Sequence, residues 1–252
     1  MEHLSKDRVV ILLDETSSTN LELKNMQKMT PQPEGSMIIA DFQTQGRGQG
    51  SSSWFSSRGN NLLFSFLLYP HFVLAKEQFI ISRIVSLALK KILDRFTPNI
   101  TIKWPNDIYW NDKKIAGMLI ENSLIGPHID FSIVGIGLNV NEEKFPDELP
   151  NPVSLKQITG HSYNRDNLLN DFYEEFFFLY RRLQNGEVSM IEKEYMMQLY
   201  RIDNFYWFED KDERFRAKIK IVLPSGHLVL ETHIDKEERK YAFKEVSFIP
   251  EY

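Results

Sequence analysis

Residues 100–140 restrict the possible folds most strongly, because four short apolar segments follow one another there with no room for a helix between them. The segments cover residues 100–104, 107–110, 115–121 and 129–140. Two turn-forming pairs, Asn111-Asp112 and Gly126-Pro127, separate the last three segments. Strands joined by tight turns pair in antiparallel fashion, whereas parallel pairing needs a long crossover. The region therefore predicts several antiparallel strands of one sheet.

The preceding part of the chain adds further strands and one helix. Short strands are predicted over residues 9–13, 36–43 and 62–69. The first of these is apolar throughout, so we expect it to be buried. Thr19, with Glu22 three residues later, forms a capping-box pattern, which predicts a helix that runs to about Met29.

Three more helices are predicted from apolar periodicity and capping residues. Residues 76–96 carry apolar side chains on one helical face. Asn164 is a favourable cap for a long helix that ends near Gly186, and a shorter helix follows over residues 187–199. Residues 141–160 hold three prolines, so we expect mostly loop there.

The pattern changes after Asp203. Four or five short β-prone segments occupy about 50 residues, and Pro224-Ser225-Gly226 supplies a turn between two of them. Such close spacing is typical of a small β-barrel. The chain as a whole predicts an α+β fold, with a mixed, largely antiparallel sheet flanked by helices in residues 1–203 and a small β domain in residues 204–252.

Composition excludes several classes of site. The chain has 30 basic and 35 acidic residues and a formal net charge of -5, so no nucleic-acid partner is expected. It has no cysteine, which excludes disulfides, thiolate metal sites and cysteine nucleophiles and fits a cytoplasmic protein. No apolar run is long enough for a signal sequence or a membrane span. The six histidines show no metal-binding spacing.

A glycine-rich segment is the first candidate for ligand binding. Residues 46–54 read Gly-Arg-Gly-Gln-Gly-Ser-Ser-Ser-Trp. Glycines allow backbone N–H groups to turn toward an anion, Arg47 adds a charge suited to carboxylate or phosphate, and Trp54 can cover a flat ligand. Neither a P-loop nor a dinucleotide fingerprint is present. A flexible surface loop is an equally good interpretation of the composition alone.

Three further motifs carry polar groups next to predicted strands. In Lys103-Trp104-Pro105-Asn106-Asp107, the carboxylate of Asp107 is a candidate ligand for Mg²⁺ or a ribose, although Asn-Asp after Pro is also ordinary turn chemistry. Lys114, three residues before Gly117, is a candidate catalyst beside a phosphate or simply part of a polar hairpin. In Gly135-Ile136-Gly137-Leu138-Asn139, glycines inside a strand mark the close approach of a ligand or backbone, or a bend.

Taken together and in this order, these motifs resemble those of one family, the biotin protein ligases. The matching residues are Ser18-Thr19-Asn20, Gln43, Gly46-Arg47-Gly48, Trp54, residues 103–107, Lys114 with Gly117, and residues 135–139. The resemblance covers nearly the whole chain. It implies a catalytic core like that of class II synthetases, followed by a small SH3-like barrel. The chain begins directly at the catalytic core of that pattern, without the DNA-binding segment of longer members, so a repressor function is not implied.

The resemblance also implies the chemistry. Biotin is activated with Mg·ATP to biotinyl-5'-adenylate and then transferred to a lysine of the biotin carboxyl carrier domain of a carboxylase such as acetyl-CoA carboxylase. Lys114 and Arg47 are the implied catalytic residues. The implied biotin site comprises Ser18, Thr19, Asn20, Gln43, Gly46, Arg47, Gly48, Lys114 and Gly117. The implied adenylate site comprises Gln49, Trp54, Asn106, Asp107, Lys114 and Asn139, with Asp107 as the candidate Mg²⁺ ligand.

One part of the family pattern is missing. The family usually has Arg where this chain has Gln49, and often another Arg before the tryptophan, where this chain has Ser51-Ser52-Ser53. Two rival functions remain: a lipoate protein ligase with the same two-step mechanism, and a non-catalytic protein that binds biotin or adenylate. The sequence leaves open whether the protein is a monomer or a homodimer.

Overall fold

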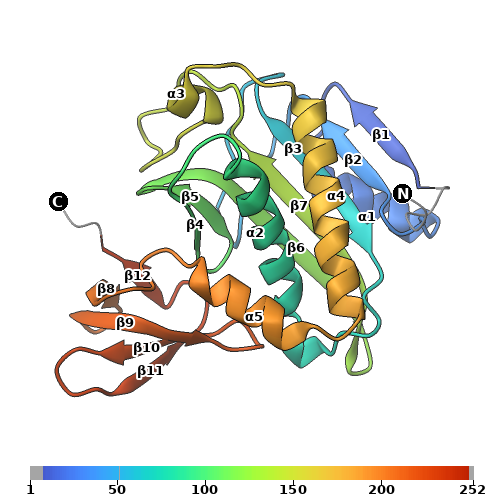
Figure 1. Cartoon of the computed structure of the whole chain (residues 1–252). Helices are drawn as coiled ribbons and strands as arrows, with labels where there is room; N and C mark the ends of the chain where they lie inside the picture. The colour runs from blue at the N-terminus through green and yellow to red at the C-terminus, as the bar shows by residue number, and fades with distance from the viewer. Residues whose placement is uncertain (1–7, 51, 250–252) are drawn as a thin grey trace.

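In a computed structural model that describes residues 8–50 and 52–249, the chain forms a seven-stranded sheet with flanking helices and a five-stranded antiparallel sheet (Figure 1). The first sheet contains β1 (Val10–Leu13), β2 (Met37–Ala40), β3 (Leu62–Leu68), β4 (Ile100–Lys103), β5 (Asp107–Trp110), β6 (Lys113–Ile125) and β7 (His128–Leu138). The helices are α1 (Thr19–Met29), α2 (Phe79–Leu93), α3 (Leu155–Thr159), α4 (Arg165–Gln184) and α5 (Val188–Met197), with a 3-10 turn at Ala75–Glu77. The second sheet contains β8 (Tyr206–Asp210), β9 (Arg214–Val222), β10 (Leu228–Thr232), β11 (Glu238–Tyr241) and β12 (Val246–Phe248).

The order of strands in the first sheet is β1-β2-β3-β7-β6-β5-β4. The pairs β4–β5, β5–β6 and β6–β7 are antiparallel, which confirms the arrangement predicted for residues 100–140. Only β1 and β2 among the described strands of this sheet pair in parallel, and α1 connects them as a crossover. The sheet is therefore mixed but largely antiparallel, as predicted.

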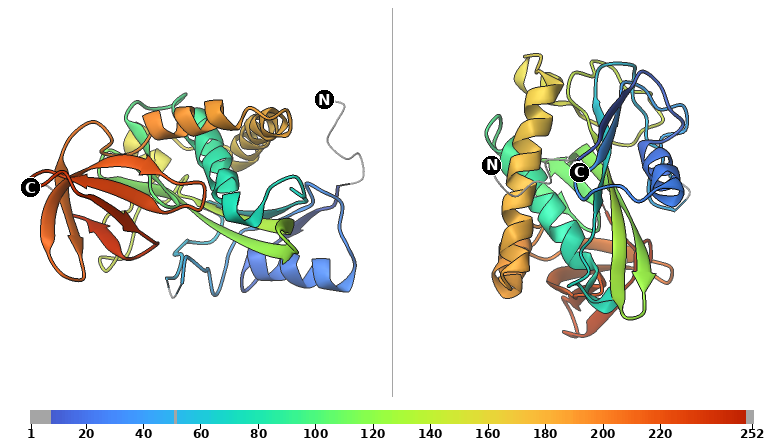
Figure 2. Two further views of the ribbon diagram at one scale, coloured as in Figure 1. Left: turned by 90° about the horizontal axis from the view of Figure 1, so that it is seen from below. Right: turned by 90° about the vertical axis from the view of Figure 1, so that its right-hand side faces the viewer.

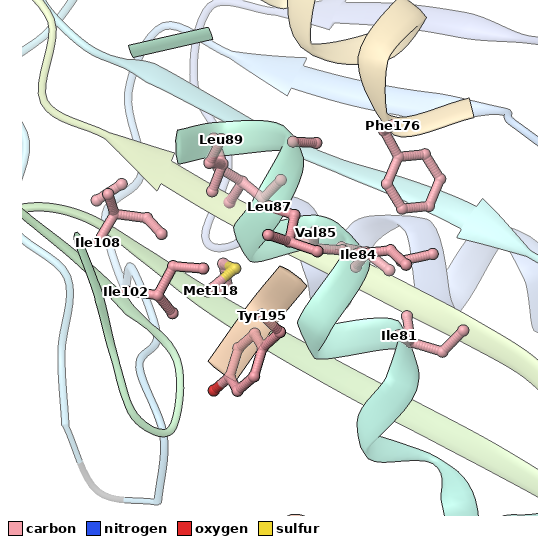
Figure 3. Close-up of a cluster of buried hydrophobic side chains, with 14 of the residues drawn as sticks. Ile81, Ile84, Val85, Leu87, Leu89, Ile102, Ile108, Met118, Phe176 and Tyr195 are labelled. Atoms are coloured by element: carbon pink, nitrogen blue, oxygen red, sulfur yellow. The ribbon is translucent and has the colours of Figure 1, made fainter. Parts of the chain in front are cut away.

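Helices cover the two faces of this sheet unequally. Figures 1 and 2 show α2, α4 and α5 on one face and α1 on the other. The first face holds the main core, in which Ile84 and Val85 of α2 lie among Met118 of β6, Phe176 of α4 and Tyr195 of α5 (Figure 3). The α1 face has a much smaller apolar cluster of Leu23, Ile38, Leu67 and Ile133. This face therefore has room for a cavity beside α1.

Two local predictions were wrong. Strand β1 was expected to be buried, but it is an edge strand and the side chain of Leu12 is 72% exposed. The capping box expected at Thr19 is absent, because the cap of α1 is Ser18 and its side chain makes no capping bond. Residues 141–160 are mostly loop, as predicted, and also hold the short helix α3, whose Ser154 and Gln157 form a capping box.

The five-stranded sheet must curl strongly on itself. Its order is β11-β10-β9-β8-β12, so β11 and β12 are at opposite edges although only residues 242–245 connect them. Four strand spacings of a flat sheet span roughly 19 Å, and the connection reaches at most about 17 Å when fully extended. The short connection between β11 and β12 is therefore a tight turn that brings the two edges of the sheet close together. This sheet agrees with the predicted small C-terminal β domain. The domain boundary near residue 203 stays a prediction.

The second sheet is held against the first part of the chain by polar and aromatic contacts. Arg83 of α2 is 2% exposed, donates a hydrogen bond of 2.6 Å to the carbonyl of Val222, and pairs with Glu192 of α5. Trp104 donates a hydrogen bond of 2.8 Å from Nε1 to the carbonyl of Gly226. None of the described helices is long and apolar enough to cross a membrane.

Replacement of Arg83 should weaken the attachment of the second sheet. Arg83→Met leaves the Val222 carbonyl and Glu192 without their partner, so the free energy of unfolding should fall by about 1–3 kcal/mol. Lys91→Met on the same helix is the control, because Lys91 is 58% exposed in its ion pair with Glu175 and should contribute less than about 1 kcal/mol. Urea unfolding of the two variants measures the difference, and equal stabilities would contradict the assigned role of Arg83.

Candidate functional site

A cavity of about 220 Å³ opens on the α1 face of the seven-stranded sheet. Its walls come from the start of α1, the glycine-rich segment, β5, β6, β7 and one residue of the turn between β11 and β12. The lining residues are Ser18, Thr19, Asn20, Gln43, Arg47, Gly48, Gln49, Ser52, Ser53, Trp54, Asn106, Asp107, Lys114, Gly117, Met118, Leu119, Gly135, Ile136, Gly137 and Lys244. Segments far apart in the sequence thus meet over the centre of the sheet.

The floor of the cavity is a strip of sheet that carries no side chains. Gly117 of β6 pairs with Gly137 of β7, and Gly135 lies two residues earlier on the same face. A Cβ on Gly137 would lie 2.3 Å from Cε2 of Trp54, and a Cβ on Gly135 would lie 2.0 Å from Oδ1 of Asn20. Side chains from α1 and the glycine-rich segment therefore rest directly on the backbone of the sheet. The close approach predicted for these glycines is made by side chains in this structure.

One end of the cavity is lined by neutral hydrogen-bonding groups. Oε1 of Gln43 accepts a hydrogen bond of 2.8 Å from the backbone N–H of Thr19 and lies 3.2 Å from its Oγ1. This bond replaces the expected capping box at the start of α1. It also turns the amide nitrogen of Gln43 away from the helix and toward the glycine-rich segment, where a Cβ on Gly46 would lie 3.4 Å from Nε2. Ser18 is 3% exposed and adds a hydroxyl to the same end.

Asn20 and Ser65 fix this end of the cavity from behind. Nδ2 of Asn20 donates to the carbonyl of Leu119 at 3.1 Å and to Oε2 of Glu121 at 2.9 Å. Oγ of Ser65 lies 2.6 Å from Oδ1 of Asn20 and 2.7 Å from Oγ1 of Thr19. The amide of Asn20 is therefore occupied within the protein and positions the start of α1 on β6.

Glu121 holds the first cation of the site. Its carboxylate lies 2.9 Å from Nη2 of Arg47 and 3.1 Å from Nζ of Lys24. Burial opposes ionisation of Glu121, but hydrogen bonds from Asn20 and Lys24 and the charge of Arg47 outweigh it and lower its pKa. Arg47 is thus fixed at the mouth of the cavity by a carboxylate that stays charged.

Lys114 is the second cation and lies at the other end. Its Nζ is 2.7 Å from Oδ1 of Asp107 and 5.5 Å from the ring centre of Trp54. Trp54 lies over Gly117 and Gly137, and its Nε1 is buried without a hydrogen-bond partner among the described residues. The strand pairing of Asp107 with Gly117 brings the Lys103–Asp107 motif and the Lys114–Gly117 motif together.

A second cavity, of about 190 Å³, shares Trp54, Ser53 and Lys114 with the first. Its other lining residues are Phe55, Asn139, Phe145, Leu149, Pro150, Asn151 and Pro152. Asn139 donates a hydrogen bond of 3.1 Å to the carbonyl of Val153, and its Oδ1 is buried without a partner in the described part of the chain. An apolar slot with one unpaired amide oxygen suits a flat heterocycle that carries an amino group.

The glycine-rich segment folds as a hairpin rather than as an irregular loop. Arg47 and Ser53 form a β-bridge, and the N–H of Gly48 donates to the carbonyl of Ser52 at 2.7 Å. The N–H of Trp54 donates to the carbonyl of Gly46 at 2.8 Å, and a Cβ on Gly46 would lie 2.5 Å from the Trp54 carbonyl oxygen. Gly46 is therefore needed for hairpin packing. Ser51, one of the serines at the missing arginine positions, lies outside the described residues.

Most of the predicted site residues meet in the first cavity. The exceptions are Gly46, which supports the hairpin, and Asn139, which lines the second cavity. Sequence reasoning missed Glu121, Ser65 and Lys244. Ser65 is the one polar residue of the apolar strand β3 and pairs with Gly135, and this isolated position was the available signal.

The described residues offer few ligands for a metal ion, so an ion would need further ligands from a bound nucleotide. In the described residues, no three His, Cys, Asp or Glu side chains gather closely enough to hold an ion by themselves. Asp107 contributes one carboxylate, and Oδ1 of that carboxylate lies against Lys114. Mg²⁺ commonly binds through one or two carboxylates together with substrate phosphates and water. Asp107 therefore fits an ion that arrives with a polyphosphate.

The ionised state of Glu121 gives a pH-dependent prediction. Because the pKa of Glu121 is below its ordinary value of 4.5, its stabilising effect is present above pH 4.5 and is lost as the pH falls through the lowered pKa. Glu121→Gln should therefore be less stable than the unchanged protein at neutral pH, and the difference should shrink below pH 4.5. Thermal unfolding across this range measures it, with the exposed Glu148→Gln as a control that should show little effect. A difference independent of pH would contradict the assigned ion pairs.

Comparison with known proteins identifies the family. A model of the biotin/lipoate A/B protein ligase family matches residues 12–139. The bifunctional ligase/repressor BirA of Bacillus subtilis is 36% identical over 157 residues, which cover 61% of this chain and 47% of the relative. The biotin–[acetyl-CoA-carboxylase] ligase of Paracoccus denitrificans is 34% identical over 169 residues, which cover 63% of this chain and 68% of the relative. The matched region thus spans about half the length of the Bacillus protein.

Solved structures support the fold over almost the whole chain. The biotin protein ligase from Aquifex aeolicus in complex with biotin and ATP superposes with a TM-score of 0.79 and 24% identity, over 96% of this chain and 99% of that chain. The agreement includes the seven-stranded sheet with its flanking helices. The matched residues, 12–139, contain the glycine strip, Lys114 and Trp54, which borders both cavities. Because the family model covers these residues, the chain belongs to the biotin/lipoate A/B protein ligase family.

Proposed function

We propose that the chain is a biotin protein ligase, which activates biotin with ATP and transfers it to a lysine of a carrier protein. The observation that carries the proposal is the division of the cavity into two chemically different ends. Gln43, Ser18 and Thr19 line a neutral end, whereas Lys114 and Asp107 lie at a charged end next to the slot at Asn139. These two ends match the two substrates. Biotin joins a neutral ureido ring to a carboxylate, and ATP joins adenine to a chain of phosphates.

The neutral end suits the ureido ring. A ureido group presents one carbonyl acceptor and two N–H donors, which neutral hydroxyl and amide groups can satisfy without burying a charge. The amide nitrogen of Gln43 and the hydroxyls of Ser18 and Thr19 supply such groups. Asn20 and Trp54 lie on the strip of Gly135 and Gly137, so these two side chains border the part of the cavity that is open to a ligand.

The charged end suits the first step. The carboxylate of biotin attacks the α-phosphorus of ATP, pyrophosphate leaves, and biotinyl-5'-adenylate forms. The approach of a carboxylate to a polyphosphate is opposed by charge repulsion. Arg47 and Lys114, placed on opposite sides of the strip, offset that repulsion and stabilise the charge of the transition state.

The second step needs no nucleophile from this chain. The amine of a carrier lysine attacks the acyl carbon of the adenylate, AMP leaves, and an amide bond forms with release of a proton. We propose a biotin carboxyl carrier domain as the partner and the cytoplasm as the place of reaction. The carboxylase named for the Paracoccus relative and the absence of cysteine support these two assignments.

Mg²⁺ is proposed as part of the nucleotide substrate. It would partly neutralise the phosphates, with Asp107 as the residue of this chain that faces it. The nucleotide base would occupy the slot between Trp54, Phe55 and Phe145, where the unpaired Oδ1 of Asn139 would accept a hydrogen bond from an exocyclic amine.

A lipoate ligase is the second candidate, because the family includes both activities. Lipoate has no ureido head and offers nothing to hydrogen-bond with Gln43. The Paracoccus relative and the Aquifex structure are named for biotin, which also favours biotin over lipoate. A non-catalytic binding protein is disfavoured, because Arg47 and Lys114 are both present and both held in the cavity.

Direct transfer tests the proposal. The chain is incubated with Mg·ATP, a biotin carrier domain, and either biotin or lipoate, and mass spectrometry identifies the modified lysine. Biotin on the carrier lysine is expected, together with no modification when ATP is omitted. Lipoyl transfer alone would assign the chain to the other branch of the family, and adenylate or biotin binding without transfer would make it a binding protein.

Lys114 should matter for the rate more than for biotin affinity. Lys114→Ala removes a charge at the phosphate end, so formation of biotinyl-adenylate should slow by about 10²–10³-fold. Lys113→Ala is the matched control, because Lys113 is the exposed neighbour on the same strand. Single-turnover formation of the adenylate measures the rate, and a Lys114→Ala rate within threefold of the unchanged protein would remove this residue from the mechanism.

A further inference from the structure

Among the residues that line the main cavity, Lys244 comes from the second sheet and belongs to none of the motifs described above. It lies in the turn of residues 242–245 that joins β11 to β12. A Cβ on Gly50 would lie 2.7 Å from Nζ of Lys244, so the ammonium group occupies the space beside the tip of the glycine-rich hairpin. The same side chain contributes to the cavity wall together with Arg47, Gln49 and Ser52.

The other two cations in this cavity each have a carboxylate partner, and Arg47 shares its partner, Glu121, with Lys24. Arg47 is 2.9 Å from Glu121, and Lys114 is 2.7 Å from Asp107. For Lys244, no ion pair is found within the described ranges, 8–50 and 52–249. Lys244 is therefore the cation of the cavity wall whose charge is not offset by a neighbouring carboxylate in the described structure.

The turn that carries Lys244 is fixed to the catalytic part of the chain. The ring of the preceding residue, Phe243, lies 6.1 Å from the ring of Phe79 and 5.5 Å from that of Trp104. The carboxylate of Glu245 closes the turn by accepting a hydrogen bond of 2.6 Å from the N–H of Ala242. The contacts of Phe243 and the hydrogen bond of Glu245 thus hold Lys244 beside Gly50.

The backbone at Lys244 has a φ of 69°, a conformation that favours glycine. This chain has a lysine there, although glycine would fit without strain. Lys236, with a φ of 60°, shows that the conformation alone does not mark a function, because its ammonium lies over the ring of Phe205 and outside the cavity lining. What distinguishes Lys244 is the combination of this backbone with a side chain directed at the hairpin.

We propose that Lys244 binds the phosphate of the activated intermediate and substitutes for the arginine that the hairpin lacks at Gln49. The inference rests on the proposed function, since it assigns a further residue to the same adenylate. Gln49 can donate only a neutral hydrogen bond, whereas an ammonium at the hairpin tip adds a charge-assisted one. In this arrangement the second sheet closes the phosphate end of the site, so retention of the intermediate depends on both parts of the chain.

The test compares glycine substitutions at the two lysines that share the backbone conformation. Lys244→Gly removes the charge and relieves the strained backbone, and Lys236→Gly makes the same change away from the cavity. Biotinyl-adenylate formed in the protein is chased with unlabelled ligand in the absence of carrier. Release should be about tenfold faster in Lys244→Gly, which corresponds to 1.4 kcal/mol, and unchanged in Lys236→Gly.

Two additional variants separate charge from structure. Lys244→Arg should retain slow release, and Gln49→Arg added to Lys244→Gly should restore it. Thermal stability of Lys244→Gly should equal or exceed that of the unchanged protein, because glycine fits the backbone at this position. Slow release in the unchanged protein should weaken as ionic strength rises, and Lys244→Gly should respond less to salt.

The outcomes distinguish the inference from the proposed function. Equal release rates in the unchanged protein and Lys244→Gly would overturn the role of Lys244 and leave the ligase activity intact. If the unchanged protein forms no adenylate, the proposed function fails, and ATP binding measured by calorimetry still decides the role of Lys244. In that measurement, weaker ATP binding by Lys244→Gly than by Lys236→Gly supports the phosphate contact, and equal binding contradicts it.

Discussion

The site depends on a strip of sheet from which no side chain rises. Gly117, Gly135 and Gly137 face α1, while Ile136 between the last two points into the main core. The strip lets Asn20 and Trp54 lie directly against the backbone, at distances that even a methyl group would prevent. The rest of the site is arranged around this bare surface: the neutral groups with Arg47 beside them at one end, Lys114 and Asp107 at the other, and the hairpin above.

The helices cover the two faces of the sheet unequally, which explains why the glycine strip lies on the α1 face. The face under α2, α4 and α5 buries most of the apolar side chains and provides most of the hydrophobic stabilisation. The α1 face needs only a small cluster around Leu23. Loss of side chains on this face therefore costs little core packing and lets Asn20 and Trp54 lie against the bare backbone.

Two cations of the site, Arg47 and Lys114, are each held by a carboxylate. Glu121 fixes Arg47 and Asp107 fixes Lys114, so each cation is placed without a further loss of side-chain freedom on binding. An anionic ligand must compete with these carboxylates or share the cations with them. Lys244 has no carboxylate partner in the described structure, so the second sheet adds a positive charge to the same cavity.

The sequence predicted most elements of the fold because their signals are local. Antiparallel strands over residues 100–140 followed from tight turns, and the long helix after Asn164 followed from its cap. The exposure of Leu12 depended on its strand being at an edge, which only the tertiary arrangement decides. Likewise, Gln43 replaces a local cap on α1 through a bond across 24 positions in sequence.

The candidate site was predictable as motifs but not as geometry. The motifs named most of the residues that line the cavity, because glycine pairs and clustered polar residues are visible in the sequence. Glu121 was not predicted because its partner Arg47 lies 74 positions away in the sequence. Lys244 was not predicted because it meets Gly50 of the glycine-rich hairpin only through the packing of the small β domain. Their roles follow from the way the sheet and the small β domain pack around the strip.

Biotin-dependent exchange of labelled pyrophosphate into ATP tests the central claim most directly, because it reports the first chemical step without a carrier protein. The chain should catalyse exchange when Mg·ATP and biotin are both present, and exchange should be absent when lipoate replaces biotin. Exchange supported by lipoate and not by biotin, or no exchange with either acid, would contradict the assignment of the neutral end of the cavity to the ureido ring and of the charged end to ATP.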